Sequence, residues 1–202
     1  MHRHIVSIQG GMASGKTMLA QALEDAYPEL HVYYENPYPI VLKRKELGLD
    51  IRTEDGFVEN QRLFIQAEIE RFCHFPDRHI VLDRVPEDLE FYTLHYPLVH
   101  GHDWDMEFRL KTELEALRRC RSDLIIYLHA PDHLLQTRRD ADHTRTRQSF
   151  AQHEPLWALE EKWYKQFPVC PIDTTAKTPE QVREAAVHQL SSIGFLRREK
   201  EI

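Results

Sequence analysis

The chain has 202 residues, 42% hydrophobic and 29% charged, which suits a single domain spanning residues 1–202. Its 26 lysines and arginines against 33 aspartates and glutamates leave a net charge of −7, so we expect no nucleic-acid partner. The sequence contains no run of about 20 apolar residues and no signal-peptide pattern, which predicts no membrane partner. Three widely spaced cysteines fit a reducing, cytoplasmic location.

Short apolar runs alternate with helical patterns along the chain, which indicates an α/β domain with a mostly parallel sheet. In chain order, strands are predicted at residues 4–9, 31–34, 79–82, 124–128 and 169–173. Helices are predicted at residues 16–27, 54–73, 86–96, 103–119, 131–139, 149–166 and 179–194. Residues 10–14 and the proline-rich residues 35–39 are predicted to be loops that follow strands.

The segment between the first strand and the first helix matches the phosphate-binding pattern GxxxxGK(S/T). Its residues are Gly10, Gly11, Met12, Ala13, Ser14, Gly15, Lys16 and Thr17. Glycines let backbone amides and the positive end of the following helix face phosphate oxygens. Lys16 is predicted to act on the terminal phosphates and Thr17 to bind Mg²⁺. A glycine-rich turn with a surface lysine is the alternative, but the flanking strand and helix favour a site for ATP and Mg²⁺.

Polar residues at strand ends are the next candidates, because ligands of open parallel sheets bind beyond the carboxyl ends of the strands. Glu35 follows the second predicted strand, and Asp83 and Arg84 follow the third. Asp83 is predicted to hold Mg²⁺, and Arg84 to reach a phosphate or a substrate oxygen. In the alternative interpretation, Asp83 caps the following helix and Arg84 pairs with Glu87 or Asp88.

An arginine-rich segment at about residues 138–148 is predicted to be a lid over the triphosphate. Arginine suits this task because its planar guanidinium can hold phosphate oxygens in pairs. Arg138, Arg145 and Arg147 are candidates for ATP binding, and Arg139 for stabilising charge during transfer. A solvated loop of mixed charge is the alternative interpretation of any single arginine.

Taken together, these motifs resemble those of the deoxyribonucleoside kinases and the related thymidylate-kinase-like proteins. The resemblance covers nearly the whole chain and includes the phosphate-binding loop, Glu35 in YENP, Gln66 in RLFIQAEIER, Asp83 and Arg84 in LDRVPED, and the closing VCPIDTT. It implies a three-layer P-loop NTPase fold, with a five-stranded parallel sheet flanked by helices and an arginine-rich lid. It also implies that a nucleoside lies beside the phosphate-binding loop.

The resemblance also implies roles for single residues. Glu35 would be the general base on the 5′-hydroxyl, Asp83 and Arg84 would position that hydroxyl and Mg²⁺, and Gln66 would read the base. The sequence departs from the family at three places. Asp83-Arg84-Val85 replaces Glu-Arg-Ser, Asn36 separates Glu35 from the following proline, and the Arg-Gly-Arg lid motif is missing. Its place is taken either by Arg138 and Arg139 or by Arg145, Thr146 and Arg147.

Three hypotheses about function remain open at this stage. The first is a kinase that phosphorylates the hydroxyl group of a nucleoside or a nucleoside-like small molecule. The second is a nucleoside monophosphate kinase, and the third is a regulatory P-loop protein that is operated by a nucleotide. The helices predicted at residues 86–96 and 103–119 carry aromatic residues that fit either a homodimer interface or a core: Phe91, Tyr92, Tyr96, Trp104 and Phe108.

Overall fold

The computed structural model describes residues 4–84, 86–141 and 154–196. Its centre is a five-stranded sheet in the order β2-β3-β1-β4-β5, in which every neighbouring pair is parallel. The strands are β1 (Ile5–Gln9), β2 (His31–Tyr33), β3 (Ile80–Asp83), β4 (Leu124–His129) and β5 (Val169–Asp173). All five lie within one or two residues of the predicted strands. The fold class expected from the sequence is therefore confirmed.

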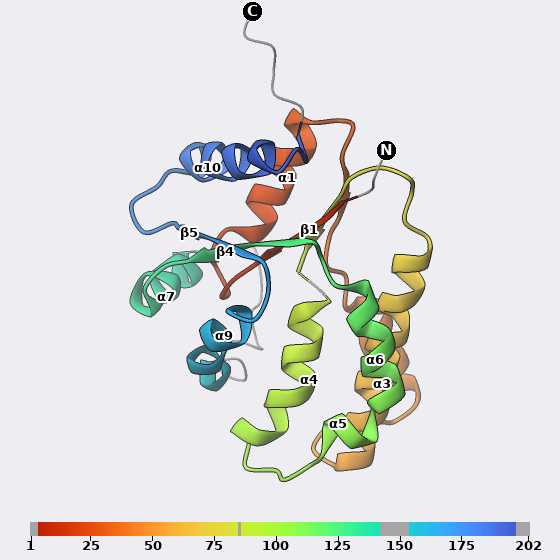
Figure 1. Ribbon diagram of the computed structural model, residues 1–202. Helices are drawn as coiled ribbons and strands as arrows, with labels where there is room; N and C mark the ends of the chain where they lie inside the picture. Colours follow the sequence, from red (N-terminus) through yellow and green to blue (C-terminus); the bar gives the residue numbers. More distant parts are fainter. Residues whose placement is uncertain (1–3, 85, 142–153, 197–202) are drawn as a thin grey trace, which may run out of the picture.

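Helices cover both faces of this sheet (Figure 1). On one face lie α1 (Lys16–Ala26) and α10 (Pro179–Ser192), and on the other α3 (Glu54–Cys73), α4 (Glu87–Val99), α6 (Lys111–Leu117) and α9 (Trp157–Tyr164). The remaining helices are α2 (Tyr38–Glu46), α5 (Met106–Arg109) and α7 (Asp132–Ala141). A 3₁₀ turn at Arg118–Cys120 follows α6, and another at Glu154–Leu156 precedes α9.

Two parts of the predicted helix pattern are wrong in detail. The proline-rich residues 35–39 are predicted to form a loop, but α2 begins at Tyr38. This helix buries none of its residues, so its sequence lacks the regular spacing of apolar residues that predicts a packed helix. The single helix predicted at residues 103–119 is divided, because Leu110 has φ −120° and separates α5 from α6. Of the helix predicted at residues 149–166, residues 149–153 lie outside the described part of the chain.

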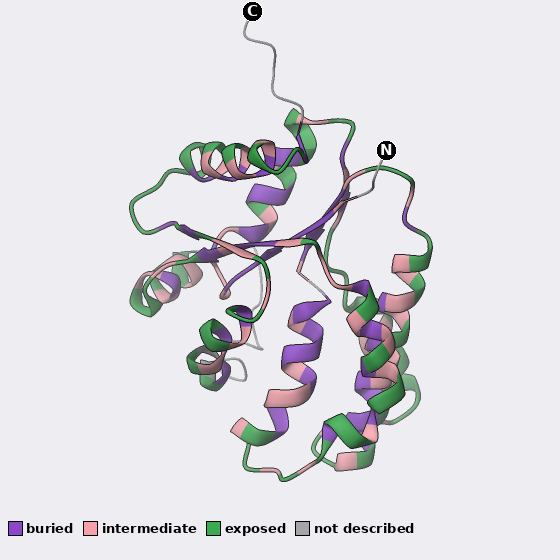
Figure 2. Ribbon diagram, viewed as in Figure 1, coloured by how far each residue is buried: buried purple, intermediate pink, exposed green. Residues whose placement is uncertain are grey.

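The core has a layer on each side of the sheet, and buried residues follow the strands and the inner helix faces (Figure 2). One layer joins β1, β3 and β4 to α1 and α10, and includes Val6, Leu23 and Leu190. A second joins α3, α4 and α6, where Phe57 stacks on Tyr96 with the ring centroids 5.2 Å apart. Phe91 and Tyr96 are thus core residues, whereas Phe108 is 75% exposed.

None of the helices in the described ranges combines the length and the apolar composition needed to cross a membrane. The three cysteines are free thiols: Cys73 is exposed, Cys120 buried and Cys170 half-buried.

Candidate active site

The phosphate-binding loop requires glycine at its first position. Gly10 has φ 132°, and a Cβ atom there would lie 2.0 Å from the carbonyl oxygen of Leu128 in β4. Gly15, at φ 102°, ends the loop as the N-cap of α1 and offers no side chain to the free amides of the first turn. Those amides and the helix dipole therefore face the loop, an arrangement that favours an anion. Ser14 Oγ is buried without a hydrogen-bond partner among the described residues.

Lys16 folds back over this loop. Its Nζ donates to the carbonyl oxygens of Gly10, at 2.7 Å, and Gly11, at 2.8 Å. Burial, and after it the charge of Arg84, lowers the pKa of Lys16 to about 8, although nearby carboxylates, Glu160 first, oppose the shift. A buried ammonium group that only backbone carbonyls hold is well placed to interact with a phosphate.

Thr17 and Asp83 meet beside the loop, although 66 residues separate them in sequence. The Thr17 hydroxyl donates to Asp83 Oδ2 at 2.7 Å, which joins the first turn of α1 to the end of β3. A hydroxyl and a carboxylate are both hard oxygen ligands of the kind that Mg²⁺ prefers. The pair predicted to hold the metal therefore lies together, and its donor atoms suit Mg²⁺. Among the described residues, no cluster of three or more His, Cys, Asp or Glu side chains has the arrangement of a metal site.

Arg84 follows β3 in an unusual conformation, with φ 70°, and its amide donates to the carbonyl oxygen of Ile8. Its guanidinium lies between two carboxylates: Nε is 3.7 Å from Glu35 Oε2, and one terminal nitrogen is 3.4 Å from Asp88 Oδ2. Burial opposes the charge, but Asp88 and then Glu35 raise the pKa of Arg84 above its ordinary value. The left-handed backbone costs about 1–2 kcal/mol, and such strain clusters at functional sites.

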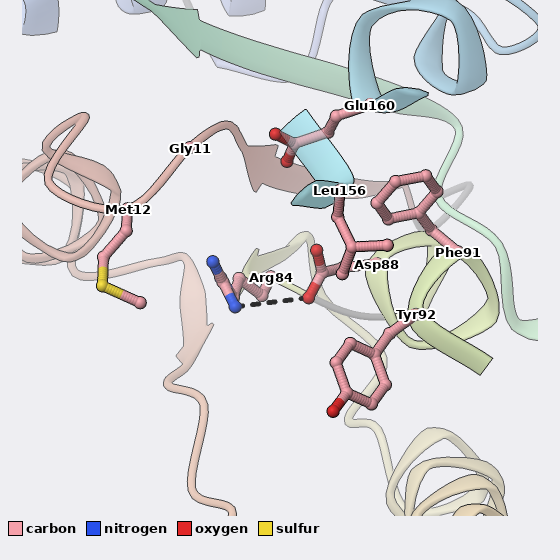
Figure 3. Close-up of a pocket in the computed structure, with 8 residues that line it drawn as sticks. All are labelled: Gly11, Met12, Arg84, Asp88, Phe91, Tyr92, Leu156 and Glu160. Atoms are coloured by element: carbon pink, nitrogen blue, oxygen red, sulfur yellow. Dashed lines mark hydrogen bonds and ion pairs between the residues drawn. The ribbon is translucent and has the colours of Figure 1, made fainter. Parts of the chain in front are cut away.

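A pocket opens between the phosphate-binding loop, α4 and the start of α9 (Figure 3). The pocket is partly open to solvent. Its lining combines charged side chains with apolar and aromatic ones: Gly11, Met12, Arg84, Asp88, Phe91, Tyr92, Leu156 and Glu160. The pocket therefore offers carboxylates and aromatic faces directly beside the predicted phosphate site.

Glu160 is a further candidate site residue, which the sequence motifs do not identify. It is only 7% exposed and lies on α9, almost 80 residues from Arg84 in sequence. Burial, and then Asp88, raises its pKa to about 7, while Arg84 and Lys16 oppose the shift. A buried glutamate in a helical segment carries no local motif, so sequence offered no signal for it.

Gln66, the glutamine predicted to read a base, is exposed on α3 and does not line the pocket. Gln61 is the buried glutamine of that helix, and its side-chain oxygen accepts a hydrogen bond from Thr93 of α4 at 3.0 Å. A signal for this was present, because Gln61 lies one turn after the apolar Phe57 and one turn before Ile65. Gln66 directly follows Ile65 and so turns away from that face.

The arginines predicted for the lid are only partly within the described residues. Arg138 donates to the hydroxyl of Thr174 at 2.9 Å and to its carbonyl oxygen at 2.6 Å, beyond the end of β5. Arg139 pairs with the adjacent Asp140 at 2.7 Å. Arg145 and Arg147 lie outside the described residues, as does most of the segment at residues 138–148.

The fold matches solved structures of nucleoside and nucleotide kinases. Deoxyadenosine kinase from M. mycoides with bound dATP aligns with a TM-score of 0.69 and 18% identity, covering 94% of this chain and 100% of that chain. The same enzyme with bound dCTP gives 0.68 and 18%, with 93% and 99% covered. Thymidylate kinase from Candida albicans gives 0.66 and 18%, with 96% and 93% covered.

No protein-family model matches the sequence, and no curated protein matches it either. At 18% identity, the structural matches establish the fold. The structural match that the sequence motifs led us to expect is confirmed: this chain has the P-loop fold shared by deoxyadenosine kinase and thymidylate kinase.

Proposed function

We propose that this protein is a single-domain, ATP- and Mg²⁺-dependent kinase that phosphorylates the 5′-hydroxyl of a nucleoside or nucleoside-like compound. The observation that carries the proposal is the position of Arg84. This arginine links Glu35 to a pocket that adjoins the phosphate-binding loop. A general-base candidate, an acceptor pocket and a triphosphate site are thereby adjacent. Deoxyadenosine kinase, which shares this fold, has been solved with dATP, with dCTP and with the product dCMP, which supports a nucleoside as the acceptor here.

The donor side uses the phosphate-binding loop. Lys16 exchanges its two carbonyl partners for oxygens of the terminal phosphates, and the amides at the start of α1 bind the remaining charge. Thr17 and Asp83 would hold Mg²⁺, which supplies charge neutralisation at the phosphates. Arg138 and Arg139, at the end of α7, and Arg145 and Arg147 beyond it would cover the triphosphate. Water would thus be kept from the transferring group.

On the acceptor side, Glu35 takes the proton from the attacking hydroxyl, and Arg84 orients the hydroxyl oxygen. The new bond forms between that oxygen and the γ-phosphorus. The bond between the γ-phosphorus and the β–γ bridging oxygen breaks, and ADP leaves with the electron pair. An already anionic monophosphate acceptor would need no such base, so Glu35 separates the two kinase hypotheses.

Replacement of Glu35 with Gln tests this proposal. Glu35→Gln keeps the size of the side chain but removes the proton acceptor, so kcat should fall by about 10²–10⁴-fold while the dissociation constant for ATP is unchanged. ADP release is measured with ATP, Mg²⁺ and a panel of nucleosides, monophosphates and small alcohols. Glu29→Gln, at an exposed position before β2, is the matched control and should keep full activity.

Two results would contradict the proposal. Turnover that occurs only with monophosphates and survives in Glu35→Gln would identify a nucleotide kinase. Absence of any acceptor-dependent turnover would favour a regulatory P-loop protein.

A further inference from the structure

Glu160 is a largely buried residue whose side chain lines the pocket. Only 7% of this residue is exposed, yet its carboxylate makes no hydrogen bond and no ion pair with the described residues. Figure 3 shows the carboxylates of Glu160 and Asp88 directed into the space between the phosphate-binding loop and α4. An ionised carboxylate that loses water without gaining hydrogen bonds is destabilising, which burial reflects in its raised pKa.

Two other buried glutamates, by contrast, have hydrogen-bond or ion-pair partners that stabilise their carboxylates. Glu87 accepts hydrogen bonds from the side chains of Ser7 and Gln9 and from both the amide and the hydroxyl of Ser122. Glu90 pairs with Arg118 at 2.7 Å and Arg121 at 2.6 Å. Glu160 has no comparable contact in the described part of the chain. Its carboxylate is therefore free for a group that enters the pocket.

The charges around the pocket indicate what that group is. Among the described residues, three carboxylates, Glu35, Asp88 and Glu160, lie around the guanidinium of Arg84. Lys16 offsets part of this charge from a distance but pairs with none of the three, because its ammonium group donates to the loop carbonyls. A phosphate on the acceptor would meet this negative excess in a site of low dielectric, where like charges repel strongly. An N–H or O–H donor would instead satisfy a carboxylate.

We propose that Glu160 is a specificity-determining, acceptor-binding residue that accepts a hydrogen bond from an N–H or O–H group of the acceptor. The site thereby takes an uncharged or cationic hydroxyl compound and rejects its monophosphate. The aromatic faces of Phe91 and Tyr92 complete the pocket for an acceptor with a ring. This inference rests on the proposed kinase function and narrows the acceptor.

Binding measurements test it independently of turnover. Isothermal titration calorimetry at pH 8, where Glu160 is mostly ionised, compares deoxyadenosine and deoxycytidine with their 5′-monophosphates. Mg²⁺ and a saturating nonhydrolysable ATP analogue are present, so that the phosphate-binding loop is occupied. The wild-type protein should bind the better nucleoside at least tenfold more tightly than its monophosphate. In Glu160→Gln this ratio should fall about tenfold, because a charge-assisted hydrogen bond becomes a neutral one and the repulsion is relieved.

Glu161→Gln is the matched control, since the neighbouring Glu161 is exposed and paired with Lys165 at 2.8 Å. Its ratio should equal that of the wild type. An unchanged ratio in a folded Glu160→Gln protein overturns the assignment. So does a wild type that binds the monophosphate as tightly as the nucleoside, or binds neither nucleoside saturably. Selective binding without phosphoryl transfer would contradict the proposed function while supporting the assignment of Glu160.

Discussion

Lys16 and Glu160 carry opposite charges in one buried region, and burial shifts the pKa of each toward its neutral form. The pKa of Lys16 falls to about 8 and that of Glu160 rises to about 7. Neither group is paired with the other in the structure. Both are therefore held at a cost to stability near neutral pH, which is the pattern expected of residues kept for a ligand rather than for folding.

A pH titration of stability follows from the shift at Glu160. Its folded-state pKa, about 7, exceeds the ordinary value of 4.5, so between these values the folded state keeps a proton that the unfolded state releases. Stability from this group is therefore fully present below pH 4.5 and is lost as the pH rises through 7. Urea unfolding at pH 5 and pH 7.5 should show a larger loss of unfolding free energy in the wild type than in Glu160→Gln.

The difference in pH dependence between the wild type and Glu160→Gln separates the contribution of Glu160 from that of the other titrating groups. Glu161→Gln should not reproduce it, because a hydrogen bond from Lys165 lowers the pKa of Glu161, so this group is ionised in both the folded and the unfolded state from pH 5 to pH 7.5 and adds no pH dependence there. Parallel pH profiles for the wild type and Glu160→Gln would show that the carboxylate is not desolvated as the structure indicates.

The candidate site residues that could be predicted from the sequence are those whose role depends on residues close to them in the chain. Gly10, Lys16 and Thr17 lie within one loop and one helical turn, so a local pattern identifies them. The meeting of Thr17 with Asp83 was predictable because Thr17 lies in the first turn of the helix that follows β1, and Asp83 ends the adjacent parallel strand β3. Glu160 could not be found in this way, because its place beside Arg84 depends on how α9 packs.

At the scale of the elements, β1 and β4 lie so close that the loop between β1 and α1 needs a glycine. Gly10→Ala places a Cβ atom 2.0 Å from the Leu128 carbonyl oxygen, and φ 132° is a conformation that alanine rarely adopts. Both effects should destabilise the protein. Gly48→Ala is the matched control, since Gly48 also has positive φ, at 64°, but has no atom within 4 Å of the added Cβ.

Urea unfolding measures the two variants. Gly48→Ala should cost about 1 kcal/mol from backbone strain alone, and Gly10→Ala clearly more, because the backbone of β4 has to shift. Equal losses in the two variants would mean that the loop adapts without displacing β4.

Strand positions were predictable because each strand is a short apolar run that ends in polar residues. The element that escaped prediction is α2, which lies on the surface and buries nothing. Tertiary context rather than sequence period fixes such a helix. The division between α5 and α6 likewise depends on one residue, Leu110, which is fully buried at the bend and continues the apolar period of both helices. The spacing of apolar residues alone therefore predicts one continuous helix in place of α5 and α6.

For the whole molecule, the candidate site exists only when distant segments are folded together. The phosphate-binding loop, Glu35 after β2, Arg84 after β3 and Glu160 on α9 come from four parts of the chain. A ligand that needs all of them binds the folded state and not the unfolded state. Its binding free energy is then added to the stability of the fold.

Stabilisation by Mg²⁺ and ATP is therefore the prediction at this scale. At an ATP concentration of 100 times its dissociation constant, with Mg²⁺, the free energy of unfolding should rise by about 2.7 kcal/mol. In Lys16→Ala most of this gain should disappear at the same concentration, because the variant lacks the ammonium group that the loop carbonyls hold beside the proposed phosphate site. Chelation of Mg²⁺ should also reduce the gain in the wild type. Without the metal, the Thr17 hydroxyl and the Asp83 carboxylate supply no positive charge to offset that of the phosphates. Lys111→Ala, at an exposed position on α6, should respond to ATP as the wild type does. If ATP stabilises Lys16→Ala as strongly as the wild type, the nucleotide binds somewhere other than the loop at residues 10–17.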